Sequence, residues 1–240
     1  MKRHIPNLIT SLNLVSGFIA IIFAANGNLF TASWLIVAAM IFDFFDGFSA
    51  RLLKSYSDIG KELDSLADVV SFGVAPALII YQLLNRSLMI NSQAVINSGG
   101  TGALLILIIP AVMPVCAALR LAVFNLDSTQ STSFKGLPTP ANALAVVSVV
   151  IAEHYSESTV FTSITGSLTA LIILTVVLSL LMVSRIPLLS LKIKNLNFKG
   201  NEGRYILILL VALSLIILGT SAVPLIIPLY IIASFAALLF

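Results

Sequence analysis

Long apolar stretches separated by short polar breaks run along the whole chain. A helix needs about 20 apolar residues to cross a bilayer, and eight stretches come close to that length, at residues 8–26, 31–53, 59–84, 102–124, 138–154, 160–184, 203–221 and 223–240. The last two are separated by a short turn from Ser221 to Pro224, so seven spans is the nearest alternative. Pro138 and Pro140 begin the fifth stretch, where proline suits the first turn of a helix. The pattern predicts an all-α, polytopic transmembrane helix bundle of about eight spans.

The composition agrees with this pattern and excludes several protein classes. Of the 240 residues, 59% are hydrophobic and 10% are charged, whereas charged residues make up about 25% of an ordinary soluble domain. A soluble enzyme, a disordered linker and a basic domain that binds nucleic acid are therefore excluded. Since no soluble segment interrupts the pattern, we expect a single integral membrane domain over residues 1–240. Cys116 is the single cysteine, so the chain has neither an internal disulfide nor a CxxC metal site.

The positive charges predict how the chain is oriented. Cytoplasmic loops of membrane proteins carry an excess of lysine and arginine. With the N-terminus inside, twelve of the 13 basic residues fall on or near the inner side, and Arg86 falls outside. We therefore expect both termini to be cytoplasmic. The inner set comprises Lys2, Arg3, Arg51, Lys54, Lys61, Arg120, Lys135, Arg185, Lys192, Lys194, Lys199 and Arg204.

Four aspartates lie within or beside the second and third apolar stretches: Asp43, Asp46, Asp64 and Asp68. A carboxylate inside a span is costly, by roughly 2.5–3.5 kcal/mol on insertion scales. Spacings of three and four residues put each pair on one face of its helix. A short loop near residues 54–58 makes the two helices antiparallel neighbours, so Asp43 lies level with Asp68, and Asp46 with Asp64. Given a suitable rotation of the helices, the four carboxylates face one another.

Clustered carboxylates are typical ligands of a hard divalent cation. Such oxygens suit Mg²⁺, Mn²⁺ or Ca²⁺, and four of them can hold two divalent ions about 3.5–4 Å apart, as in enzymes of phosphoryl transfer. Gly47, Ala50 and Gly60 lie on the aspartate faces, which fits either close helix packing or the approach of a flat ligand to the backbone. Arg51, one turn from Gly47, is either a phosphate contact or an interfacial arginine.

Together these residues form one motif, Asp43-x₂-Asp46-Gly47-x₂-Ala50-Arg51-x₈-Gly60-x₃-Asp64-x₃-Asp68. The motif resembles the signature of the CDP-alcohol phosphotransferase family, with every specified position present. Members of this family are integral membrane enzymes that use divalent metal. They displace CMP from a CDP-activated lipid or alcohol by means of a second alcohol.

The resemblance implies roles for named positions. Asp43, Asp46, Asp64 and Asp68 would ligate metal, and Asp68 would also accept the proton of the incoming hydroxyl. The positions that match contacts to the CDP group are Gly47, Arg51, Ser57 and, as a close backbone approach, Gly60. The opening Pro6-Asn7-Leu8-Ile9-Thr10 resembles the nucleotide-contacting segment of the family, which gives the same role to Asn7 and Thr10. Taken alone, Asn7 and Thr10 read as helix-start residues.

Three further segments narrow the branch of the family. Residues 72–77, 120–125 and 136–140 are similar to segments of bacterial, membrane-integral phosphatidylserine synthases. The resemblance covers about residues 1–142, which we expect to be the catalytic core around the hairpin 31–84, while hydropathy alone assigns the spans of 138–240. Val123 stands where the family often has an arginine, so Arg120 and Asn125 are the candidates for binding the acceptor alcohol.

We therefore expect a phosphatidyltransferase of the bacterial inner membrane with its active site facing the cytoplasm. It would transfer a phosphatidyl group from CDP-diacylglycerol to L-serine, giving phosphatidylserine and CMP, with two Mg²⁺ or Mn²⁺ ions. A homodimer is implied by the resemblance. The main alternative is an enzyme of the same family with glycerol 3-phosphate or another alcohol as its acceptor. A cation transporter is a distant alternative, because transporters usually build their sites from symmetry-related halves.

Overall fold

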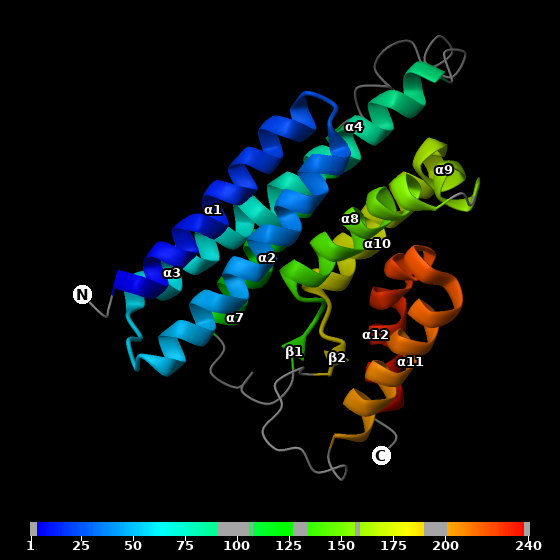
Figure 1. Cartoon of the computed structure of the whole chain (residues 1–240). Helices are drawn as coiled ribbons and strands as arrows, with labels where there is room; N and C mark the ends of the chain where they lie inside the picture. Colours follow the sequence, from blue (N-terminus) through cyan, green and yellow to red (C-terminus); the bar gives the residue numbers. More distant parts are fainter. Residues whose placement is uncertain are drawn as a thin grey trace.

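The computed structural model describes residues 4–90, 106, 108–126, 134–156, 159–189 and 201–237, which are almost entirely helical (Figure 1). The predicted all-α fold is confirmed. The first half contains α1 (His4–Ala25), α2 (Leu29–Leu52), α3 (Asp58–Asp68), the π-helical segment η1 (Val69–Val74), α4 (Ala75–Ile90), the 3₁₀ segment η2 (Ile109–Ala111) and α7 (Val112–Leu126). The second half contains α8 (Thr139–Tyr155), α9 (Thr159–Gly166), α10 (Leu168–Val183), α11 (Glu202–Leu218), the 3₁₀ segment η3 (Gly219–Leu225) and α12 (Ile226–Ala236). A short antiparallel pair joins β1 (Phe134–Lys135) to β2 (Pro187–Leu188).

Within these described ranges, 5 helical runs are long and apolar enough to cross a membrane, or 6 if the bent pair α9 and α10 counts as one span. The predicted count of eight is therefore not confirmed. Residues 203–221 and 223–240 were expected as separate spans. Their described part forms one apolar run, Glu202–Ala236, which η3 folds into the antiparallel pair α11 and α12 (Figure 1). Helix α8 has 17 residues and begins between Pro138 and Pro140, as the prolines predict. Residues 102–105 and 107 of the fourth predicted span, and 238–240 of the eighth, lie outside the described part of the chain.

The predicted span over 160–184 is broken into two helices. Helix α9 ends at Gly166, α10 begins at Leu168, and the two are bent by 81°. The break has a local cause, because the Ser167 hydroxyl accepts a hydrogen bond from the amide of Ala170 at 3.3 Å. A serine in extended conformation with this bond is an N-cap, which starts a new helix.

The bundle is built around the first three apolar runs. Helices α1 and α2 form an antiparallel pair, and the run α3–η1–α4 packs along them (Figure 1). Helix α8 packs against α2, α4 and η1, and its middle is buried. Phe72, Ile79, Ile80 and Leu83 are among the largest fully buried side chains, so the core lies where the third run meets its neighbours.

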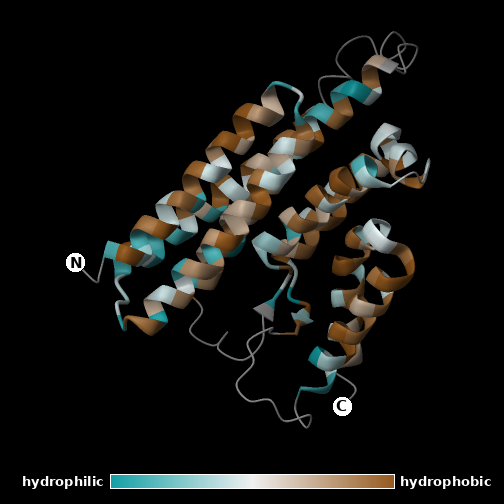
Figure 2. Ribbon diagram, in the orientation of Figure 1, coloured by the Kyte–Doolittle hydropathy of each residue, from teal (hydrophilic) through white to brown (hydrophobic). Residues whose placement is uncertain are grey.

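One end of the bundle gathers the polar termini of the helices. The start of α1, the end of α2 and the start of α3 lie there (Figure 1). Figure 2 shows that hydrophilic residues collect toward helix ends, while the helix middles are mostly hydrophobic. This distribution suits a membrane protein, whose apolar helix faces contact lipid.

Candidate active site

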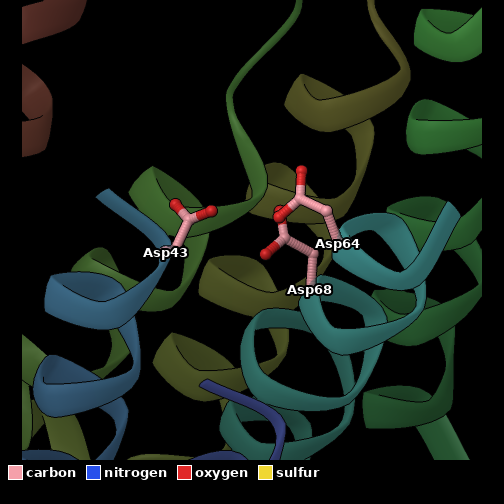
Figure 3. A group of neighbouring side chains, drawn as sticks. All are labelled: Asp43, Asp64 and Asp68. Carbon is pink, nitrogen blue, oxygen red and sulfur yellow. The ribbon is translucent and has the colours of Figure 1, made fainter. Parts of the chain in front are cut away.

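Three of the four aspartates meet between α2 and α3. Asp43 reaches from α2 toward Asp64 and Asp68 on α3 (Figure 3). One carboxylate oxygen of each residue lies within 4.8 Å of the others, and Asp68 is buried. The antiparallel connection through residues 53–57 produces this meeting, as the spacing of the aspartates predicts. The structure thus brings carboxylates of both helices to one place.

Asp46 lies beside this group rather than in it. It is buried, and its Oδ2 has no hydrogen-bond partner among the described residues. Three helical residues turn by about 300°, so Asp46 is rotated roughly 60° from Asp43 about the axis of α2. Asp46 and Asp64 instead line a common cavity. The equal height expected for Asp46 and Asp64 agrees with this arrangement.

The donor set fits a divalent metal ion. Carboxylate oxygens are acceptors without a proton to give, and three of them converge here, from half-buried Asp43 and Asp64 and from buried Asp68. Asp64 Oδ1 is buried and has no hydrogen-bond partner among the described residues. Buried, unpaired anionic oxygens are costly, so a bound cation would stabilise this arrangement. An all-oxygen set favours a hard cation over zinc.

Asp68 is enclosed by polar side chains from two other helices. The Asn13 amide on α1 donates a hydrogen bond to Asp68 Oδ1 at 3.4 Å. The Thr139 hydroxyl, in the first turn of α8, donates to Asp68 Oδ2 at 3.4 Å. Asn13 and Thr139 are both fully buried. Neither residue was expected to contact an aspartate, because their partners lie far along the chain.

A cavity of about 190 Å³ lies next to Asp46 and Asp64, between α1, the end of α2 and the start of α3. Most of the residues expected to contact the nucleotide line it. The lining residues are Pro6, Asn7, Thr10, Asp46, Gly47, Ala50, Ser55, Tyr56, Ser57, Gly60, Lys61 and Asp64. Arg51 lies on the exposed last turn of α2 and is not among them.

The two glycines of the cavity differ in what surrounds them. A Cβ on Gly47 would meet nothing within 4 Å, so Gly47 leaves open space beside the cavity. A Cβ on Gly60 would lie 2.9 Å from Asn7 Oδ1 and 3.0 Å from Ser57 Oγ. Gly60 is therefore needed for close packing, while Gly47 leaves room for a ligand. The Ser57 hydroxyl caps α3 by accepting a hydrogen bond from the amide of Gly60 at 3.0 Å.

Lys61 is a charged cavity residue that the sequence did not lead us to expect in the site. Its ammonium donates to the Asn125 carbonyl at 2.9 Å, at the end of α7. The Asn125 amide in turn donates to the Ser65 hydroxyl at 2.9 Å, so Asn125 links α7 to α3. The signal was available in the sequence, since Lys61 follows Gly60 and lies four residues from Ser57, one turn along α3.

Arg120, the other candidate for the acceptor, lies on α7 near the aspartates. It is close enough to interact electrostatically with Asp68 and with Tyr230 of α12. Its Nε is buried and has no hydrogen-bond partner among the described residues. Tyr230 is buried and donates its hydroxyl to the Leu189 carbonyl at 2.9 Å. The C-terminal helix pair therefore contributes to the surroundings of Arg120.

A family model described as CDP-alcohol phosphatidyltransferase matches residues 3–232. The chain belongs to the CDP-alcohol phosphatidyltransferase family. A CDP-diacylglycerol–serine O-phosphatidyltransferase of Helicobacter pylori (strain J99) is 35% identical over 210 residues, covering 85% of this chain and 78% of that protein. The enzyme of the same name in Bacillus subtilis (strain 168) is 36% identical, covering 60% and 74%. An archaetidylserine synthase of Methanothermobacter thermautotrophicus is 36% identical, covering 64% and 60%. The resemblance inferred from the aspartate motif is thus confirmed at the level of the family.

Proposed function

We propose that this chain is a CDP-diacylglycerol–serine O-phosphatidyltransferase, which transfers a phosphatidyl group from CDP-diacylglycerol to L-serine. The observation that carries the proposal is the meeting of Asp43, Asp64 and Asp68 next to a polar cavity at one end of an apolar bundle. The names of its relatives in the same family support serine as the acceptor.

The cavity binds the CDP head group of the donor. Asn7 and Thr10 offer hydrogen-bonding groups from α1, and Gly47 leaves space for a flat base. Lys61 supplies a positive charge on the cavity wall and can contact a phosphate oxygen. The acyl chains of the donor remain in the bilayer, beside the apolar faces of the helices.

Asp43, Asp46, Asp64 and Asp68 would hold two divalent ions, Mg²⁺ or Mn²⁺, which neutralise charge on the pyrophosphate when bound. Asp68 accepts the proton of the serine hydroxyl as a general base. The serine oxygen then forms a bond to the phosphorus that carries diacylglycerol, and the bond from this phosphorus to the CMP oxygen breaks. The products are phosphatidylserine and CMP, and the proton leaves Asp68 for solvent or CMP.

We assign to Arg120 the binding of the carboxylate of serine. Its guanidinium lies near Asp68, so an amino acid held by Arg120 can present its hydroxyl to Asp68. Arginine recognises carboxylates through paired hydrogen bonds. Asn125 has a different role, since its side chain and its carbonyl already bond Ser65 and Lys61.

The site faces the cytoplasm of a bacterial inner membrane. The described basic residues at the end of α2 and the start of α3, among them Arg51, Lys54 and Lys61, lie at the same end of the bundle as the cavity. Arg86 lies near the opposite end, on the last turns of α4. Lysine and arginine mark the cytoplasmic side, where soluble serine meets a lipid donor.

A panel of acceptor alcohols, tested with the purified full-length chain, identifies the acceptor substrate. CDP-diacylglycerol is supplied with labelled L-serine, glycerol 3-phosphate or inositol phosphate, with Mg²⁺ or Mn²⁺ and with a chelator as control. We expect labelled phosphatidylserine and CMP in equal amounts, and no product with chelator. Product from glycerol 3-phosphate and none from serine would overturn the assignment of serine as the acceptor. A transporter would be favoured if divalent ions entered proteoliposomes in the absence of CDP-lipid and no phosphatidyl transfer occurred.

A further inference from the structure

A band of fully buried polar side chains lies behind Asp68. Asn13, Ser71, Thr139 and Asn142 each have no exposed surface, although all four can form hydrogen bonds. Polar groups are costly in a protein interior unless they are paired. They come from α1, η1 and α8, and those of α1 and α8 include the two that bond the Asp68 carboxylate, Asn13 and Thr139.

The first part of this band bonds Asp68 directly. Asn13 donates to Oδ1 and Thr139 donates to Oδ2, each at 3.4 Å. Each carboxylate oxygen therefore receives one donor. Thr139 is placed by its neighbours, since Pro138 precedes α8 and Pro140 follows in its first turn, where the proline ring fixes φ.

The second part holds the backbone that follows Asp68. Residues Val69–Val74 form a π-helical segment, a wide turn that occurs frequently at functional sites. The Ser71 hydroxyl donates to the Asn13 carbonyl at 3.1 Å. The Asn142 amide donates to the Phe72 carbonyl at 3.3 Å. Asn142 lies three residues after Thr139, so both project from one face of α8.

We propose that Asn13, Thr139 and Asn142 are positioning residues that fix the orientation of the Asp68 carboxylate toward Asp43 and Asp64. An ionised carboxylate oxygen can accept about two hydrogen bonds, so one donor on each oxygen leaves the other lone pair for a cation or a proton. Asn13 and Thr139 prevent rotation of the carboxylate. Asn142 holds η1, the segment that begins directly after Asp68. Residues that orient a metal-binding carboxylate in this way contribute strongly to affinity and activity. The inference rests on the proposed function for the role of Asp68.

Four variants of the full-length chain in detergent test this assignment, three at buried threonines and one, Asn13→Leu, on α1. Thr139→Val removes the donor at nearly constant volume, and Thr139→Ser retains the hydroxyl. Thr175→Val is the matched control, because Thr175 is also fully buried and its hydroxyl bonds the Leu171 carbonyl of its own helix at 2.7 Å. The measurements are kcat and KM for phosphatidyl transfer, the binding of Mn²⁺ alone by electron paramagnetic resonance, and the thermal midpoint.

We expect Thr139→Val to lower Mn²⁺ affinity or kcat by roughly 10–100-fold, with a thermal midpoint close to that of Thr175→Val. Thr139→Ser should restore both quantities toward the wild-type values. Asn13→Leu should lower Mn²⁺ affinity or kcat in the same way, although it leaves α8 unchanged. The proposal is overturned if Thr139→Val matches Thr175→Val in Mn²⁺ binding and turnover, or if Thr139→Ser is as impaired as Thr139→Val.

The Mn²⁺ measurement separates this inference from the proposed function. If the wild-type chain transfers nothing to serine, the proposed function fails. Weaker Mn²⁺ binding by Thr139→Val than by Thr175→Val would still support the positioning role. If serine is the acceptor and Thr139→Val behaves as the control does, the function stands and the positioning role is wrong.

Discussion

Replacement of Gly17 by alanine should separate α1 from the segment that follows Asp68. A Cβ on Gly17 would lie 2.2 Å from Ser71 Oγ and 2.7 Å from Ser71 Cα. Non-bonded carbon atoms prefer about 3.5–4.0 Å, so α1 and η1 must move apart by about 1 Å. Ser71→Ala cannot fully relieve the clash, because the backbone Cα remains in place.

This movement has two consequences that can be measured. The bond from Asn13 to Asp68 is already 3.4 Å long, so it breaks when α1 moves away. Overpacking of this kind typically lowers stability by about 1–3 kcal/mol. A misplacement of about 1 Å near a reacting group can lower turnover by about 10²-fold. We therefore expect Gly17→Ala to melt at a lower temperature and to lose most of its kcat.

The assay compares kcat for phosphatidylserine synthesis and the thermal midpoint in one detergent. Gly166→Ala is the control, because a Cβ at Gly166 would meet nothing within 4 Å. The reasoning is refuted if Gly17→Ala is as active and as stable as Gly166→Ala. A loss of stability with unchanged kcat would refute the link from α1 to Asp68 and leave only the packing argument.

Three other substitutions test separate parts of the account. Gly47→Ala should leave the thermal midpoint unchanged, because its Cβ enters open space. It should raise the KM for CDP-diacylglycerol, because Gly47 lines the cavity. An unchanged KM would contradict the placement of the donor in this cavity. Lys61→Met should raise the same KM by roughly tenfold, the effect of one charge-assisted hydrogen bond, while Lys61→Arg stays close to wild type; equal KM values for both variants would exclude a phosphate contact. Arg86→Ala breaks the ion pair with Glu153 (2.9 Å) at the opposite end of the bundle. We therefore expect a loss of at most about 1 kcal/mol in the free energy of unfolding and an unchanged kcat. A large fall in kcat would show that this end takes part in the reaction.

The aspartate hairpin could be predicted because its geometry is local. Residues 43–68 contain two helices and one short connection, so helical spacing and an antiparallel turn set the heights of all four carboxylates. The rotation of each helix about its axis was not determined by this reasoning. For that reason the separation of Asp46 from the group of Asp43, Asp64 and Asp68 became visible only in the structure.

The polar residues around Asp68 could not be predicted from the same pattern. Asn13 and Thr139 lie 55 and 71 residues from Asp68, and hydropathy does not say which helices become neighbours. The break at Ser167 and the π-helical segment after Asp68 were also missed, because a continuous apolar run looks the same whether its helix is straight, widened or bent.

The most direct test of Asp68 as the general base is the turnover of the variant Asp68→Asn. Asparagine keeps the size of the side chain but cannot accept a proton as a carboxylate does. We predict that this variant folds and still binds Mn²⁺ through the remaining aspartates, more weakly than wild type, but forms phosphatidylserine from CDP-diacylglycerol and L-serine at least about 10²-fold more slowly than wild type. Turnover near the wild-type rate would contradict the assignment of Asp68 as the base.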